Sequence, residues 1–76
     1  MDRKYIDMCK NFFLDTSNIA MTAKLLKAAV SVENVMRTEK IRFTTKEYRA
    51  CAEHAALEVT LDREVETAAQ DNYLQR

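Results

Sequence analysis

The sequence predicts an all-α fold, a small three-helix bundle in which a short helix, a central helix and a long C-terminal helix pack together. The 76 residues include no Gly and no Pro, and Ala, Leu, Lys, Glu, Met and Arg are abundant. Gly and Pro are the usual residues of turns and strand edges, whereas the abundant residues are good helix formers. Apolar residues also recur at helical spacing along three segments. We therefore expect one helical domain over residues 1–76, with short polar connections.

The first predicted helix covers residues 2–14. Its apolar stripe follows the spacing i, i+3, i+4, i+7 and i+8, and consists of Tyr5, Met8, Cys9, Phe12 and Phe13. Residues 15–18 read Asp-Thr-Ser-Asn, and such side chains compete for backbone hydrogen bonds, which favours helix caps over helix interiors. We expect the first helix to end before them, and Asp15 or Ser17 to cap the next helix.

The second predicted helix covers residues 19–42. It carries two neighbouring apolar stripes, one made of Ile19, Ala23, Leu26 and Val30, the other of Leu25, Ala28, Ala29, Val32 and Met36. Together the stripes form a wide apolar surface, which suits a helix that packs on two neighbours. Ser31 can cap a helix, so the sequence leaves open whether residues 15–43 hold one helix or two.

The start of the third predicted helix has two independent signals. With Thr44 as the N-cap, Glu47 falls at the third helical position, which is the spacing of a capping box. Phe43 and Tyr48 then occupy the positions of a hydrophobic staple. Nothing breaks the helix until about Asn72, which gives a length of about 42 Å. Such a helix is longer than a small domain needs for packing.

This third helix has two apolar faces. Tyr48, Ala52, Ala55 and Val59 fall on one face at 100° per residue. The opposite face carries a second set, called the outer seam below, which consists of Leu57, Leu61, Val65 and Ala68. Acidic residues flank this seam at Glu58, Asp62, Glu64 and Glu66. Two interpretations stay open: the other helices wrap both faces at different heights, or a second copy or a partner helix covers the outer seam.

Charge is balanced over the whole chain but uneven along it. Twelve Lys and Arg residues match twelve Asp and Glu residues, so no global field draws the chain to nucleic acid or membrane. A local basic patch lies in the middle of the sequence, at Arg37, Lys40, Arg42, Lys46 and Arg49, and the charged residues from Glu53 onward are mostly acidic. A head-to-tail contact between two copies would use this dipole, although a solvated surface explains it equally well.

Cys51 and His54 are the nearest approach to a chemical motif. They are three residues apart on one helix, so their side chains are neighbours, and Cys9 can approach them from the first helix. A structural zinc site needs four ligands, usually with a local Cys-x-x-Cys pair, whereas this chain has one His and no such pair. Without Gly, the chain also lacks loops that cradle phosphates. We expect structural cysteines, no catalytic residues, no metal and no cofactor.

These observations favour a small non-enzymatic regulatory or adaptor protein that acts by protein–protein interaction through its helical surfaces. The outer seam would provide the contact, to another protein or to a second copy in a homodimer. A chain this short buries only about 60% of the surface of its unfolded form, which also favours an oligomer. No apolar run approaches the ~18 residues of a membrane span, and the N-terminal residues are charged where a signal peptide is apolar. We therefore expect no membrane contact and a cytoplasmic location.

The alternative is a DNA-binding regulator that uses residues 18–42 as a helix-turn-helix. Residues 27–30 would form the turn, and Ser31 would cap the recognition helix. Asn34, Arg37 and Lys40 would contact bases or phosphates. A zero net charge and a turn sequence without Gly oppose this hypothesis, so nucleic acid is the less favoured partner.

Overall fold

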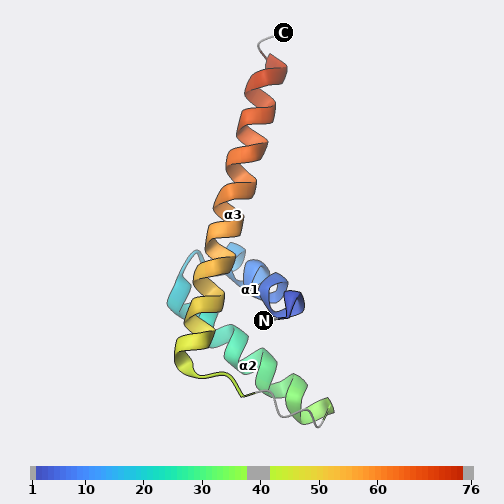
Figure 1. Ribbon diagram of the computed structural model, residues 1–76, viewed down its shortest axis with the longest axis vertical. Helices are drawn as coiled ribbons and strands as arrows, with labels where there is room; N and C mark the ends of the chain where they lie inside the picture. The colour runs from blue at the N-terminus through green and yellow to red at the C-terminus, as the bar shows by residue number, and fades with distance from the viewer. Residues whose placement is uncertain (1, 38–41, 75–76) are drawn as a thin grey trace.

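The computed structural model contains three helices, α1 (Arg3–Thr16), α2 (Ile19–Arg37) and α3 (Thr45–Leu74). Each helix packs against the other two (Figure 1). The structure describes residues 2–37 and 42–74, and the surroundings of side chains as far as residue 66. No strand occurs within these ranges. The prediction of an all-α three-helix bundle is confirmed.

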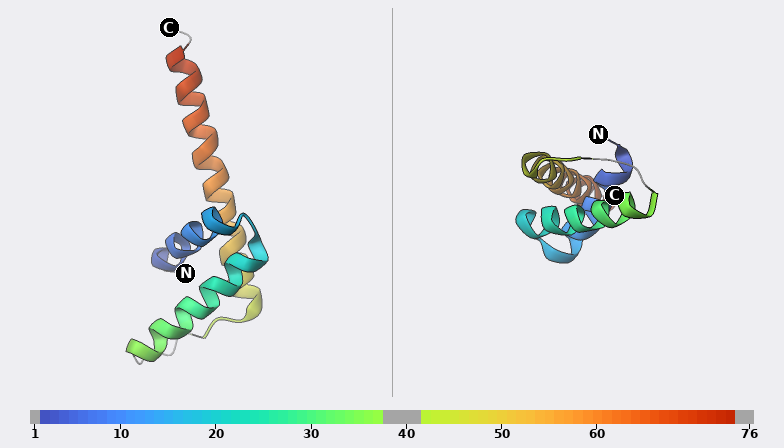
Figure 2. Two further views of the ribbon diagram at one scale, coloured as in Figure 1. Left: turned by 180° about the vertical axis from the view of Figure 1, so that it is seen from behind. Right: turned by 90° about the horizontal axis from the view of Figure 1, so that it is seen from below.

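The three helices differ in length, and this gives the molecule its shape. α3 has 30 residues, whereas α1 has 14 and α2 has 19. The first half of α3 packs between the other helices, and its second half projects beyond them as an arm (Figures 1 and 2). The side chains of residues 60–66 are all exposed. This part of the arm therefore gains little of its stability from packing within the chain.

A tight connection joins α1 to α2. Asp2 caps the start of α1, because its carboxylate accepts a hydrogen bond from the Lys4 amide at 3.2 Å. Ser17 caps the end of α1: it has a left-handed backbone (φ 51°) and donates its amide to the Phe13 carbonyl at 2.7 Å. Asn18 then caps α2, because its side-chain oxygen accepts from the Met21 amide at 3.1 Å.

The predicted caps Asp15 and Ser17 are therefore wrong. Asp15 lies inside α1, which runs to Thr16 rather than stopping at Leu14. Ser17 terminates α1 in the left-handed conformation, so the capping role passes to the next residue.

α2 continues unbroken through Ser31. The sequence left open whether this serine caps a separate helix, and it does not. The predicted end of α2 at Arg42 is wrong, because the helix ends at Arg37 and residues 42–44 are not helical. Only one of its two apolar stripes is buried. Leu26 and Val30 lie in the core, whereas Val32 and Met36 of the second stripe are well exposed. The prediction that α2 packs on two neighbours is confirmed, because it contacts both α1 and α3, although its second stripe is largely exposed.

α3 begins as the sequence predicts. The Thr44 hydroxyl accepts from the Glu47 amide at 3.2 Å, and the Glu47 carboxylate accepts from the Thr44 amide at 3.4 Å, which completes the capping box. The rings of Phe43 and Tyr48 meet edge to face with their centroids 5.3 Å apart, and the staple is thus also confirmed. Phe43 makes a similar contact with Tyr5 of α1 at 5.6 Å. These aromatic contacts attach the start of α3 to α1.

The core lies where the three helices meet. Its members are almost free of solvent contact, and they include Tyr5, Ile6, Cys9, Leu26, Val30, Tyr48, Cys51, Ala52, Ala55 and Val59. Small side chains on α3 allow the other two helices to approach it closely. Thr22 is a buried polar residue in this region, and its hydroxyl donates to the Asn18 carbonyl at 2.7 Å. Its polar atom is therefore satisfied.

Leu26 and Leu25 offer a matched test of this core. Leu26 is fully buried, whereas Leu25, its neighbour on α2, is 36% exposed. We expect Leu26→Ala to lower the free energy of unfolding by about 2–5 kcal/mol, because it leaves a cavity among the three helices. Leu25→Ala should lower it by less than about 1 kcal/mol. Urea unfolding followed by circular dichroism measures both, and equal losses would contradict the placement of α2.

Candidate functional site: the outer face of α3

α3 presents two opposite apolar faces, as predicted. The first face, at Tyr48, Ala52, Ala55 and Val59, is buried against α1 and α2. The outer seam is not covered: the side chains of Leu57, Leu61 and Val65 are 57%, 49% and 68% exposed. The interpretation in which α1 and α2 wrap both faces is therefore wrong. The backbone of Ala68 lies in α3, but the surroundings of its side chain fall outside the described residues.

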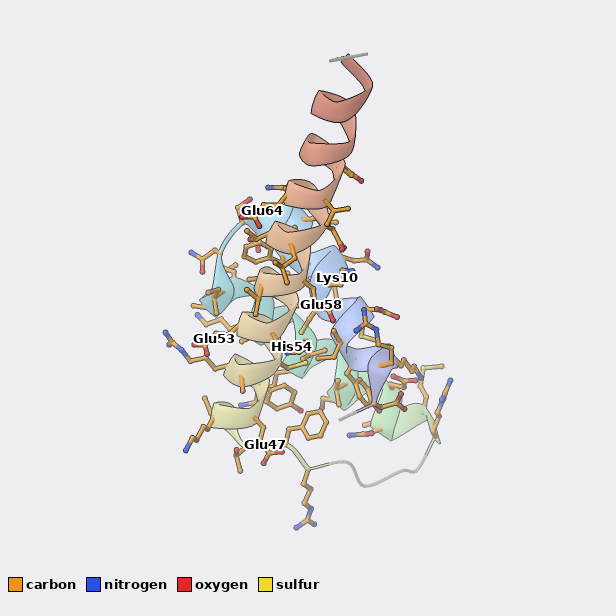
Figure 3. The ribbon with its side chains drawn as sticks, turned by 45° about the horizontal axis from the view of Figure 1, so that its top comes forward. Lys10, Glu47, Glu53, His54, Glu58 and Glu64 are labelled. Atoms are coloured by element: carbon orange, nitrogen blue, oxygen red, sulfur yellow. The ribbon has the colours of Figure 1, made fainter. Side chains whose placement is uncertain are left out.

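Ion pairs fix the point where the arm leaves the bundle. The Arg3 guanidinium donates to both carboxylate oxygens of Glu58, at 2.6 and 2.8 Å. One helical turn further along α3, Asp62 accepts from the Lys10 ammonium at 3.1 Å. Figure 3 shows Lys10 beside Glu58 between the two helices. Because both cations belong to α1, this helix sets the direction of the arm.

Glu58 is the centre of this ion-pair group. Besides Arg3, it has the Lys10 ammonium at 3.8 Å and the His54 ring nitrogen Nε2 at 3.4 Å. The hydrogen bonds from Arg3 lower the pKa of Glu58, and the positive charges around it act in the same direction. The acidic flank predicted for the outer seam is thus divided. Glu58 and Asp62 are engaged with α1, whereas Glu64 and Glu66 are exposed on the arm.

The predicted basic patch is not one surface. Arg37 lies in the last turn of α2, within 3.3 Å of Glu33, and Arg42 lies in the connection before α3. Lys46 and Arg49 lie in the first turns of α3, away from the end of α2 (Figure 1). Lys40 falls outside the described residues. Nearness in the sequence thus does not bring the last turn of α2 beside the first turns of α3 (Figure 1).

The structure forms a different basic surface, which the sequence analysis missed. A groove of about 310 Å³ between α2 and α3 is lined by Ala20, Ala23, Lys24, Lys27, Thr45, Tyr48 and Arg49. Lys24 and Lys27 are three apart on α2, which puts them on one side of that helix. Their spacing was visible in the sequence, but their proximity to Arg49 depends on how α2 pairs with α3.

The two cysteines meet in the core. Their sulfur atoms are 3.6 Å apart, and both side chains are buried. Burial raises the pKa of the Cys9 thiol to about 12 and also raises the pKa of Cys51. His54 does not join them, because its ring lies against Glu58. In the part of the chain that the structure describes, no three His, Cys, Asp or Glu residues form a cluster suited to a metal ion.

The helix-turn-helix hypothesis is wrong in its geometry. Residues 27–30, the proposed turn, lie inside the unbroken α2, so residues 31–37 cannot form a separate recognition helix. DNA binding itself stays a prediction.

No protein-family model matches the chain, and no curated protein or solved structure is significantly similar to it. A search of the described helices finds none with the length and apolar character needed to cross a membrane.

Glu58 gives a prediction for the dependence of stability on pH. Folding lowers the pKa of Glu58 from its ordinary value of about 4.5. Its contribution to the free energy of unfolding is therefore complete above about pH 4.5, and is lost as the pH falls through the pKa of the folded state. Glu58→Gln should therefore destabilise the protein near neutral pH, and the difference from wild type should shrink as the pH falls below the ordinary pKa of the carboxyl group. Urea unfolding near neutral pH and in acid measures this.

The matched control is Glu53→Gln. Glu53 is an exposed carboxylate on the same helix that pairs with Arg49 at 3.2 Å, four residues before it. An exposed pair of this kind contributes little, so the control should stay near wild type at both pH values. If Glu58→Gln is no more destabilising than the control near neutral pH, the ion-pair group does not hold α1 to α3.

Proposed function

We propose that this protein is a non-enzymatic regulatory or adaptor protein that acts by protein–protein interaction through α3, with a second copy of the chain on the outer seam. The observation that carries the proposal is the exposed row of Leu57, Leu61 and Val65 on a helix that projects from its own bundle. Contiguous apolar surface of this kind is typical of interaction sites. A row at i, i+4 and i+8 is also the usual pattern of a helix that packs on another helix.

The form of the seam supports a helical partner. The three residues lie about half a turn away from the core face of α3, so a partner could bind them without disturbing the bundle. The ion pairs of Glu58 and Asp62 with α1 hold the base of the arm in a fixed direction. A fixed arm loses less conformational freedom on binding than a free helix, which favours association.

The symmetry of the outer seam supports a second copy as the occupant. If two α3 helices run antiparallel with Leu61 opposite Leu61, Leu57 of each helix lies opposite Val65 of the other. This arrangement buries the exposed side chains of both outer seams against each other.

Leu61→Glu tests this proposal. A charge in the middle of the seam should raise the dissociation constant of the dimer by roughly 30-fold or more, because a central apolar anchor contributes about 2 kcal/mol. Circular dichroism should show unchanged helicity, since Leu61 is outside the core. Sedimentation equilibrium over a concentration series measures the association.

Thr60→Glu is the matched control. Thr60 is an exposed neighbour on the same helix, turned about 100° away from Leu61. The control adds the same charge but should leave the dimer intact. A wild-type chain that remains monomeric at every concentration would contradict self-association, and equal effects of the two variants would contradict the role of the seam.

A further inference from the structure

Cys9 of α1 and Cys51 of α3 are already in contact. Their sulfurs are 3.6 Å apart, and the side chains are 0% and 1% exposed. The sulfurs of a disulfide are about 2.05 Å apart, so the pair must approach by only about 1.5 Å to bond. Rotation of the two side chains within the helix contact can supply a movement of this size. The pair is therefore placed for a bond between the two helices.

The surroundings of the two thiols differ. A hollow of about 440 Å³ between α1 and α3 is lined by Arg3, Ile6, Ala50, Cys51 and His54. Cys9 is not among these residues, and its thiol donates a hydrogen bond to the Cys51 sulfur. A small molecule in this hollow would thus reach Cys51 first, with Cys9 behind it. Polar side chains on the wall, Arg3 and His54, make the hollow accessible to a small polar oxidant.

We propose that Cys51 and Cys9 form an oxidisable pair, in which Cys51 reacts with hydrogen peroxide in the hollow and Cys9 then closes a disulfide between α1 and α3. Cys51 is the attacking thiol and Cys9 the resolving one. The inference is independent of the function proposed for the outer seam, because Leu57, Leu61 and Val65 do not line the hollow.

The chemistry proceeds in two balanced steps. First, the Cys51 thiolate attacks one peroxide oxygen, so that an S–O bond forms and the O–O bond breaks. The leaving hydroxide takes up the proton that the thiol released, which gives one water and a sulfenic acid on Cys51. Next, the Cys9 thiolate attacks the Cys51 sulfur, so that the S–S bond forms and the S–O bond breaks, which releases a second water. Two thiols are oxidised by two electrons in total, and one peroxide is reduced to two waters.

Burial of the two thiols determines the rate of this reaction. The raised pKa of both thiols leaves little thiolate at neutral pH, so oxidation is slow and accelerates as the pH rises. In a reducing compartment the pair rests as two thiols. Once formed, the bridge would hold α1 on α3 next to the ion pairs of Glu58. It would also close a loop between residues 9 and 51 in the unfolded state, which lowers the conformational entropy of that state.

The test treats the reduced full-length chain with hydrogen peroxide, in native buffer and with dimedone present or absent. Peptide mapping by mass spectrometry should show an intramolecular Cys9–Cys51 bridge in a product that has lost two hydrogen atoms. Thermal unfolding of that product should shift upward by about 10 °C, and a reducing agent should reverse the shift. The mapping also separates this product from oxidation of the exposed Met21 and Met36.

Two variants test the order of the steps. In Cys9→Ala, Cys51 should remain a sulfenic acid that dimedone captures, because no thiol resolves it. In Cys51→Ala, Cys9 should stay largely unmodified over the same time. Capture of Cys9 as fast as Cys51 would overturn the assigned roles.

The wild-type chain alone can overturn the pairing, whether or not the variants fold. The contact predicts that, at the same pH and dimedone concentration, the ratio of intramolecular bridge to dimedone adduct is higher in native buffer than in concentrated urea, because Cys9 lies beside the oxidised Cys51 only in the folded chain. Bridging that needs urea, or disulfides found only between chains, would show that the two thiols are not poised to react.

Discussion

α3, a helix of 30 residues, extends beyond its partners of 14 and 19 residues, because both of them pack against its first half (Figure 1). The rest of the structure depends on this mismatch. The first half of α3 buries small residues such as Ala52 and Ala55 against α1 and α2, and this contact forms the core. The second half extends past both partners with Leu61 and Val65 exposed. The same helix is thus both the centre of the fold and the carrier of an exposed apolar surface.

α1 connects these two parts of α3. Its apolar side places Tyr5 and Cys9 in the core, and its charged side brings Arg3 and Lys10 to Glu58 and Asp62. Packing near the start of α3 and ion pairs near the base of the arm therefore act through one short helix. If the contacts of α1 were lost, the arm would no longer be held in one direction, and the core face of α3 would be exposed at the same time. A bond between the cysteines would strengthen the same junction at its buried side.

Local signals in the sequence predicted the parts of the fold that depend on neighbouring residues. The capping box at Thr44 and Glu47 fixed the start of α3, because its hydrogen bonds join residues three apart. The two faces of α3 followed from helical periodicity. The cap of α2 was missed because Asp15, Ser17 and Asn18 are all suitable residues, and the left-handed turn at Ser17 selects among them.

Features that depend on pairing between helices were outside the reach of sequence patterns. Both stripes of α2 looked equally apolar, but α1 and α3 meet that helix on one side, so Val32 and Met36 stay exposed. The groove that joins Lys24 and Lys27 to Arg49 arises only when α2 lies beside α3. The contact of Cys9 with Cys51 likewise depends on the relative height of α1 and α3.

The central claim is that the outer seam of α3 is completed by a second chain, and hydrogen exchange at several protein concentrations tests it most directly. If two copies pair along α3, amides of residues 57–66 should exchange more slowly as the concentration rises. Amides of residues 48–55, which the bundle already protects, should show no change and serve as an internal reference. Exchange at residues 57–66 that is equally fast at the lowest and highest concentrations would contradict the account.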